Sequence, residues 1–351
     1  MTTAPQPLRL DNIQALRGAA VLAVVLSHLM TIERKYAGDR LLGDFLSIGF
    51  SGVDLFFAIS GFVMVYVAWN KPGGLRSAAS FLFARGARIY PLYWLVSLAV
   101  LSVWMLRPEL VFASNANVSI MRSFALWPAQ SLPLLAVGWT LIHEMYFYLI
   151  FTVLVFSPPR FRLWGLMAWG ALVLAAFLAG AGAHGPVLRV LSHPLSFEFL
   201  GGALAALALR RFAGQYWRWS LLAGFALFVA ACLVSLRTGL AFWESWPRAA
   251  SFTPAVSLIV YGAAGAERAG KIFSRVLVWV GDQSYALYLT HVLSLSVAGR
   301  IWAMFAQDGP LDNIVMLSLL LAIALLAGEA THRLIETPLL HSTKHLRRRL
   351  F

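Results

Sequence analysis

Charged residues are scarce in this chain, and their scarcity excludes a large soluble domain. Asp, Glu, Lys and Arg make up 12% of the 351 residues, whereas hydrophobic residues make up 60%. Soluble domains carry about 25% charged and about 45–50% apolar residues. The longest tract without a clear membrane span is roughly 107–138. We therefore predict an all-α, polytopic transmembrane helix bundle in which residues 1–351 form a single integral membrane domain.

Cysteine is also rare, and internal repeats are missing. The single cysteine, Cys232, cannot form an internal disulfide and is best interpreted as a small buried hydrophobe. No compact spacing such as His-x-x-x-His accompanies His28, Asp54, Glu144 or His291, so we expect no metal. The net charge of +13 would favour nucleic acid in a soluble protein. Here the basic residues cluster at the ends of apolar segments, which the positive-inside rule explains without a nucleic-acid partner.

What the chain has instead is a series of long apolar segments. A membrane-spanning helix needs about 20 mostly apolar residues. The segments that meet this length are 12–31, 47–69, 89–107, 139–157, 163–181, 190–209, 218–236, 250–266, 276–297 and 312–335. We thus predict about ten spans, with room for an additional short or re-entrant helix in 120–137. The polar N-terminus lacks the pattern of a cleavable signal, so we expect the first span to be retained.

The distribution of Lys and Arg predicts how the spans are oriented. An even number of spans places both termini on one side, and 19 of the 28 Lys and Arg residues fall on that side of the bilayer. This bias predicts a multi-pass protein with both termini in the cytoplasm. We expect its membrane to be the bacterial cytoplasmic (inner) membrane. The basic tail Lys344–Arg349 is expected to touch anionic lipid.

Four predicted spans contain a buried acid or imidazole: His28, Asp54, Glu144 and His291. An ionisable side chain inside a membrane marks a functional site by default. The predicted topology places all four in one layer of the outer half. A histidine beside a carboxylate forms a positioned base, because the acid fixes the tautomer and stabilises the imidazolium. The alternative is interhelical polar contact, worth about 0.6 kcal/mol on average in membranes; Asp54 could also cap its helix, and His291 could snorkel.

Arg85 and Arg88 form a second pattern, three residues apart just before the span at 89–107. They lie on one helix face, and paired guanidiniums suit bidentate phosphate binding. The alternative is plain positive-inside anchoring. The predicted gap between these arginines and the His28 layer is roughly 20 Å, given a bilayer core of about 30 Å. Acyl-coenzyme A, with a phosphorylated head and a reactive tip, has the shape that fits such a gap.

Six sequence blocks together resemble a known family. In chain order they are Asn12-Ile-Gln-Ala-Leu-Arg17 leading to His28, Gly52-Val-Asp54 to Ser60-Gly-Phe62, Arg85 and Arg88 ahead of Tyr90-Pro91, Trp139 to Glu144 and Tyr148, Gly281-Asp282 to Tyr285, Tyr288 and His291, and Glu336-Thr-Pro338. The chain resembles the acyltransferase-3 family of integral membrane O-acyltransferases, and within it the exopolysaccharide acetyltransferases of the ExoZ type.

This resemblance implies transfer of an acyl group, usually acetyl, from cytosolic acyl-CoA to a hydroxyl of a glycan or lipid-linked saccharide at the outer face. It implies that His28 is essential and that Arg85 and Arg88 handle the coenzyme A. Supporting positions in the matching blocks are Ser60, Trp139, Tyr148, Asp282, Tyr285 and His291. Some relatives carry an esterase-like domain after the spans, and this chain is expected to act without one.

We therefore expect His28 to act as the general base, oriented by Glu144 or Asp54, with Arg17 as a further contact for the donor. His143, next to the acid, is a possible extra base on a different face of the helix. Direct transfer and an acyl-enzyme on His28 both stay open, as do acetyl and succinyl donors. A transporter or flippase is the main alternative. A structural subunit of a polysaccharide biosynthesis complex is the weakest, although such a complex is a plausible partner.

Overall fold

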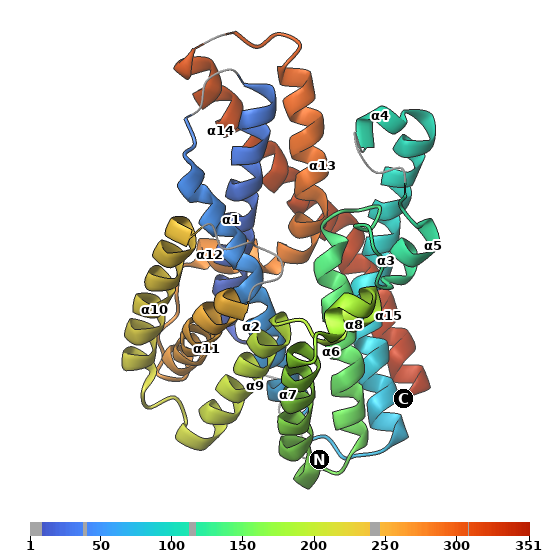
Figure 1. Cartoon of the computed structure of the whole chain (residues 1–351), viewed down its shortest axis with the longest axis vertical. Coiled ribbons are helices and arrows are strands. Elements are labelled where there is room, and N and C mark those ends of the chain that lie inside the picture. The colour runs from blue at the N-terminus through green and yellow to red at the C-terminus, as the bar shows by residue number, and fades with distance from the viewer. Residues whose placement is uncertain (1–8, 38–40, 112–116, 239–245, 308) are drawn as a thin grey trace. The chain divides into compact units, whose positions relative to one another are not determined.

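The structure, a computed structural model, describes residues 9–37, 41–111, 117–238, 246–307 and 309–351. These residues form helices and no strands, which confirms the all-α prediction (Figure 1). The helices are α1 (Asp11–Tyr36), η1 (Asp44–Ser51), α2 (Gly52–Ala68), α3 (Leu75–Leu106), α4 (Pro108–Val111), α5 (Ile120–Ala125), α6 (Gly138–Phe156), η2 (Pro159–Phe161), α7 (Arg162–Leu178), η3 (Ala181–His184), α8 (Pro186–Leu191), α9 (Leu195–Phe212), α10 (Trp217–Thr238), α11 (Trp246–Arg268), α12 (Arg275–Asp282), α13 (Ser284–Trp302), α14 (Pro310–Thr331), η4 (His332–Glu336) and α15 (Thr337–Leu350).

Within the described ranges, nine helical segments are long and apolar enough to cross a membrane. They correspond to nine of the ten predicted spans. The tenth, 276–297, falls on α12 and α13, which are not among the nine. Helix α5 is the short helix for which the sequence left room in 120–137.

The prediction for the third span was wrong at its beginning. Helix α3 begins at Leu75 instead of 89, so Arg85 and Arg88 lie inside the helix and not ahead of it. At about 1.5 Å per residue, they lie roughly 15–20 Å from its first residue. The reason is composition: residues 75–88 are rich in Ala, Leu and Arg, which favour helix without being uniformly apolar. Gly74, the residue just before the helix, has a φ of 110°, a conformation that glycine adopts readily.

The chain divides into two compact units. Unit 1 comprises residues up to Met30, Gly43–Asn70 and Phe197–Ser284, and unit 2 comprises Thr31–Leu42, Lys71–Ser196 and Tyr285–Phe351. Unit 1 therefore contains most of α1 with α2, α9, α10, α11 and α12. Unit 2 contains α3 to α8 and α13 to α15.

Glycines set the close helix packing in unit 1. A Cβ added to Gly61 of α2 would lie 1.9 Å from the Phe199 carbonyl oxygen of α9. In the opposite direction, a Cβ on Gly202 of α9 would lie 1.8 Å from the Ala58 carbonyl oxygen. Small residues let membrane helices approach this closely, because backbone then packs directly against backbone. The α2–α9 contact is therefore fixed by two reciprocal glycines.

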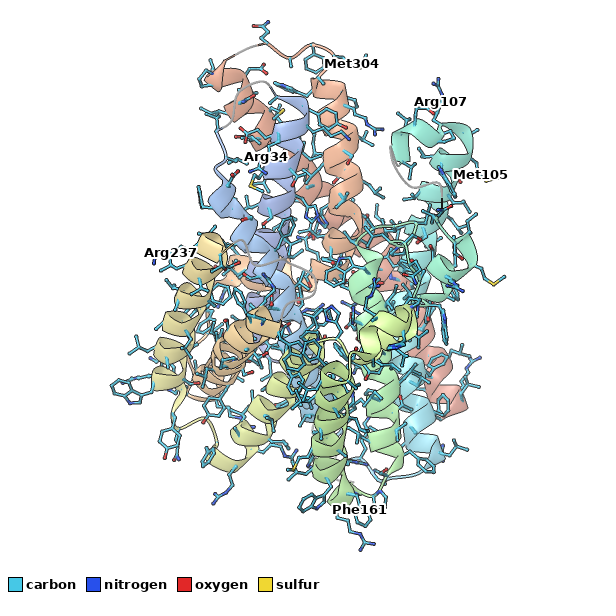
Figure 2. All side chains as sticks on the ribbon, in the orientation of Figure 1. Arg34, Met105, Arg107, Phe161, Arg237 and Met304 are labelled. Atoms are coloured by element: carbon cyan, nitrogen blue, oxygen red, sulfur yellow. The ribbon has the colours of Figure 1, made fainter. Side chains whose placement is uncertain are left out.

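In unit 2, α3 packs along both α6 and α15 (Figure 1). Phe161, after α6, and Arg107, after α3, lie toward opposite ends of this unit (Figure 2). At the Phe161 end, the Gly74 amide donates a 2.8 Å hydrogen bond to the Phe156 carbonyl and so joins the beginning of α3 to the end of α6.

Arg162 caps the carboxyl end of α6 from inside the protein. Basic residues at the ends of spans are expected at the membrane surface, yet this side chain is 0% exposed. Its Nε donates to the Leu154 carbonyl at 3.0 Å, and its Nη2 donates to the carbonyls of Lys71 at 2.8 Å, Val155 at 3.2 Å and Ser157 at 3.3 Å. A basic side chain here satisfies helix carbonyls that have no partner within the helix. One guanidinium thus joins α6 to the segment that leads into α3.

Replacing Arg162 with methionine is expected to destabilise the protein by about 2–3 kcal/mol, because buried carbonyls lose a charged donor. Thermal unfolding of detergent-purified protein measures the loss. Arg160→Met is the matched control, because Arg160 is exposed two residues earlier. Equal melting temperatures for the two variants would contradict the capping role.

Candidate active site

His28 lies on α1, half-buried, and its ring orientation is set by backbone. The ring Nδ1 lies 3.0 Å from the Val24 carbonyl oxygen, and the ring meets Phe50 edge-on with centroids 5.0 Å apart. A carbonyl can only accept a hydrogen bond, so Nδ1 carries the proton. The neutral ring then holds its lone pair on Nε2, which is the nitrogen able to accept a proton. The helix itself therefore selects the tautomer that a general base needs.

The beginning of α1 is anchored by buried polar contacts to the end of α11. The Glu267 carboxylate accepts hydrogen bonds from the amides of Asp11 and Asn12, both at 2.8 Å. The Asn12 side chain, 0% exposed, donates to the carbonyls of Ala263 and Lys271 and accepts from the Phe273 amide. An acid at a helix N-terminus is favourable because the terminal N–H groups are otherwise unpaired. This anchor fixes the helix that carries Arg17 and His28.

Arg17 and Asp282 belong to one polar group in unit 1. Arg17 donates to the Gln14 side chain at 3.3 Å, and Gln14 donates to Asp282 at 3.2 Å. Asp282 also forms an ion pair with Arg9 at 2.8 Å. Gly281 lets α12 approach α1 closely enough for these contacts, because a Cβ there would lie 1.9 Å from the Gln14 carbonyl oxygen. Gln14 thus links Asp282 to Arg17, the residue expected to be a further contact for the acyl donor.

Asp54 forms a buried ion pair that the sequence did not predict. Its carboxylate lies 2.5 Å from Nη2 of Arg248 of α11, with the two side chains 1% and 8% exposed. Glu198 of α9, 0% exposed, interacts with both Asp54 and Arg248. The guanidinium also lies over the Phe252 ring, 4.8 Å from its centroid. Three helices of unit 1 therefore meet at one charged cluster. Ser60, another supporting position, lies half-buried further along α2.

In unit 2, Glu144 lies much nearer the arginines than the sequence predicted. The Tyr148 hydroxyl donates to Glu144 at 2.5 Å, and the Arg85 guanidinium lies 5.9 Å from the centre of the Tyr148 ring. One tyrosine side chain thus spans the distance from Arg85 to Glu144. The predicted gap of roughly 20 Å between the arginines and the acidic layer is wrong for Glu144, because α3 carries its arginines inside the helix.

Glu144 and His291 are brought together around Tyr288. Glu144 interacts electrostatically with Tyr288, whose ring centroid lies 5.7 Å from that of His291. Tyr288 also pairs with the Thr140 hydroxyl at 2.9 Å. His291 is 0% exposed, and its Nδ1 donates to backbone carbonyls of its own helix. Unit 2 therefore contains one half of the predicted layer, and the pairing of His28 with Glu144 stays a prediction.

The remaining predicted positions of unit 2 lie near this group. Trp139 meets His143 edge-on at 5.8 Å, and His143 in turn lies 4.6 Å from the ring of His193. The Tyr285 hydroxyl donates to the Ile89 carbonyl at 2.7 Å, and the Arg88 guanidinium lies 5.3 Å from the Tyr285 ring centre. Each arginine of α3 thus lies against a tyrosine ring, Arg85 against Tyr148 of α6 and Arg88 against Tyr285 of α13.

The arginine end of unit 2 is strongly positive. Burial, followed by the positive charges of Arg347 and Arg85, lowers the pKa of Lys71. Lys71 lies between α2 and α3, outside both helices. These cations repel one another, and a bound anionic ligand would reduce that repulsion. This end of the unit is suited to phosphate.

Three functional candidates escaped the sequence analysis: Glu198, Arg248 and His193. Glu336 and Tyr288 were named there within the resembling blocks, but without a role of their own. Glu198 falls inside a predicted span and Arg248 immediately before one, so the rule that flagged His28 would have flagged these two as well. In the described ranges, no three His, Cys, Asp or Glu side chains gather as a group that could hold a metal ion.

Comparison with known proteins identifies the family of this chain. The family model described as an acyltransferase domain matches residues 10–329, nearly the whole chain. The chain belongs to this acyltransferase family. The match begins ahead of α1 and runs to α14, so it includes every helix that carries a predicted site residue. The resemblance stated from the sequence blocks is thereby confirmed.

Three relatives illustrate the range of this acyltransferase family. The exopolysaccharide production protein ExoZ of Rhizobium meliloti (strain 1021) is 29% identical over 317 residues, covering 85% of this chain and 92% of ExoZ. The acyltransferase MdmB of Streptomyces mycarofaciens is 28% identical over 369 residues, covering 95% and 92%. The O-acetyltransferase OatA of Staphylococcus aureus (strain NCTC 8325 / PS 47) is 24% identical over 376 residues, covering 95% of this chain but 57% of OatA.

No solved structure matches this acyltransferase. Its family and its apolar helices make it a multi-pass membrane O-acyltransferase, with the lipid bilayer as its surroundings.

Proposed function

We propose that this protein transfers an acyl group, with acetyl as the first candidate, from cytosolic acyl-CoA to a hydroxyl of an exported or lipid-linked glycan. His28 is the general base. The observation that carries the proposal is the hydrogen bond from His28 Nδ1 to the Val24 carbonyl, because it leaves Nε2 as the proton acceptor. The name of the relative ExoZ supports a glycan acceptor.

The proposed reaction balances without a metal or an oxidant. His28 Nε2 takes the proton of the acceptor hydroxyl, and the oxygen attacks the thioester carbonyl carbon. The carbon–sulfur bond breaks, and the thiolate leaves with the proton that His28 returns. A positioned base of this kind contributes typically about 10²–10⁴-fold to the rate.

Arg85, Arg88 and Lys71 are proposed to bind the phosphates of the donor. The support is the positive charge around Lys71, on whose side chain both Arg347 and Arg85 act. Guanidiniums on one helix face can each offer parallel N–H donors to phosphate oxygens. This assignment places the donor end of unit 2 in the cytoplasm, with both chain termini on the same side of the bacterial cytoplasmic membrane.

The test is release of free coenzyme A by protein purified in nanodiscs. Acetyl-CoA and succinyl-CoA are supplied in parallel, each with and without a saccharide acceptor, and the new thiol is titrated. Acceptor-dependent thiol release with acetyl-CoA is the expected result. Absence of thiol release, together with saccharide movement in proteoliposomes, would favour a transporter instead.

A further inference from the structure

Arg85 and Arg88 lie one helical turn apart on α3, yet their surroundings differ. The Arg88 guanidinium forms an ion pair with Glu336, from the turn that joins α14 to α15. The Glu336 side chain is only 2% exposed, whereas that of Arg88 is 25% exposed. A buried carboxylate beside a half-buried guanidinium cancels its charge locally and restricts its orientation.

Glu336 is itself held in place. Its second carboxylate oxygen accepts a hydrogen bond from His332 Nδ1 at 2.7 Å. The two residues begin and end the π-helical turn η4, which is closed by a bond from the Thr337 amide to the His332 carbonyl five residues earlier. Pro338 has no amide proton, so a regular helix could not form the bond that residue 338 would normally donate. The Glu-Thr-Pro sequence thus explains the wider turn, and such turns often occur at functional sites.

Arg85 has no such counter-charge. Among the described residues of its unit, Arg85 makes neither an ion pair nor a hydrogen bond, and its buried Nε lacks a partner. Its guanidinium lies over two aromatic rings, 5.5 Å from the centre of Phe81 and 5.9 Å from that of Tyr148. Aromatic faces hold a cation while leaving its N–H donors unused. A buried N–H donor without a partner is costly, and a ligand oxygen would satisfy it.

We propose that the two arginines divide the work of donor binding: Glu336 is a positioning residue that neutralises and orients Arg88, and Arg85 supplies the uncompensated charge that binds a donor phosphate. This inference rests on the proposed function, because it takes the anion to be the phosphate of acyl-CoA. It goes beyond that function by making the two arginines unequal and by giving Glu336 a role in the donor site.

The inference predicts an effect on donor binding that separates the two arginines. Arg85→Met is expected to raise both the KM for acetyl-CoA and the Kd for coenzyme A about 10- to 100-fold, because a charge-assisted hydrogen bond is lost. Arg88→Met and Glu336→Gln are each expected to raise them about 3- to 10-fold, with kcat within about twofold, because only orientation is lost. Glu329→Gln is the matched control, a carboxylate on α14 that pairs with the exposed Arg333.

A double-mutant cycle shows whether Glu336 acts through Arg88. The Arg88→Met/Glu336→Gln variant is expected to have the KM of Arg88→Met alone. If the two residues acted independently, the effects of the two substitutions on KM would combine. Additive effects, or an Arg88→Met variant as impaired as Arg85→Met, would overturn the inference. If Glu336→Gln does not fold, as judged by size exclusion, the charge exchange Arg88→Glu/Glu336→Arg replaces it, and recovery of folding without recovery of KM would also overturn the inference.

Coenzyme A binding, measured by calorimetry without turnover, separates this inference from the proposed function. Wild-type binding that depends on Arg85, without any thiol release from acetyl-CoA, would sink the proposed reaction and leave the division between the arginines standing. Thiol release from acetyl-CoA together with additive effects in the double-mutant cycle would support the proposed reaction and overturn the division between the arginines.

Discussion

Replacing His28 with alanine abolishes acyl transfer in our expectation, lowering kcat by about 10²–10⁴-fold or more. The ring is half-buried, and its Nδ1 is held by a backbone hydrogen bond to Val24, so alanine removes the proton acceptor while leaving the helix backbone in place. The KM for acetyl-CoA is expected to change little, because the phosphates are bound elsewhere. Acceptor-dependent thiol release by purified protein measures both constants.

His341→Ala is the control for this experiment, because His341 is an exposed imidazole on α15. It should match the wild type in thiol release, and both variants should elute as folded protein. Near-normal turnover by His28→Ala would show that another group removes the acceptor proton.

Replacing Arg248 with alanine should destabilise the protein by about 3–5 kcal/mol, the usual consequence of leaving a buried charge without its partner. Asp54 would lose its 2.5 Å ion pair, and Glu198 would face it without any guanidinium between them. We expect a markedly lower melting temperature and a poor yield of folded protein. The double variant Asp54→Asn/Arg248→Met should be more stable than Arg248→Ala, because the charge of Asp54 is removed together with its partner and Glu198 is then the one carboxylate of the cluster.

Arg237→Ala is the matched control, since Arg237 is an exposed residue at the end of α10 in the same unit (Figure 2). If Arg248→Ala melted as Arg237→Ala does, the cluster would not stabilise unit 1. The comparison also bears on Asp54: activity of Asp54→Asn that falls only as far as its folded fraction would assign this carboxylate to structure and not to catalysis.

The helices could be predicted from the sequence because burial in lipid demands long apolar runs, which are local signals. Nine predicted spans match helices of suitable length and composition in the described residues. The beginning of α3 could not be predicted in the same way. Residues 75–88 mix apolar residues with three arginines, Arg76, Arg85 and Arg88, and their helical state depends on packing against α6 and α15.

The candidate site was predictable in its residues more than in its contacts. Hydropathy exposes His28, Asp54 and Glu144 because each interrupts an apolar run. Nothing local shows that Asp54 meets Arg248, which is 194 residues away in sequence. The pairing of Arg88 with Glu336 is equally distant from any local pattern. Partners of buried charges are chosen by the tertiary fold, which neither periodicity nor composition encodes.

The reciprocal glycines of α2 and α9 have a mechanical consequence. Each helix presses its backbone into a notch on the other, so neither can rotate or slide without a steric clash. We therefore expect these two helices to move together as one rigid body during a catalytic cycle. A conformational change that admits a substrate would then involve helix contacts other than the one between α2 and α9.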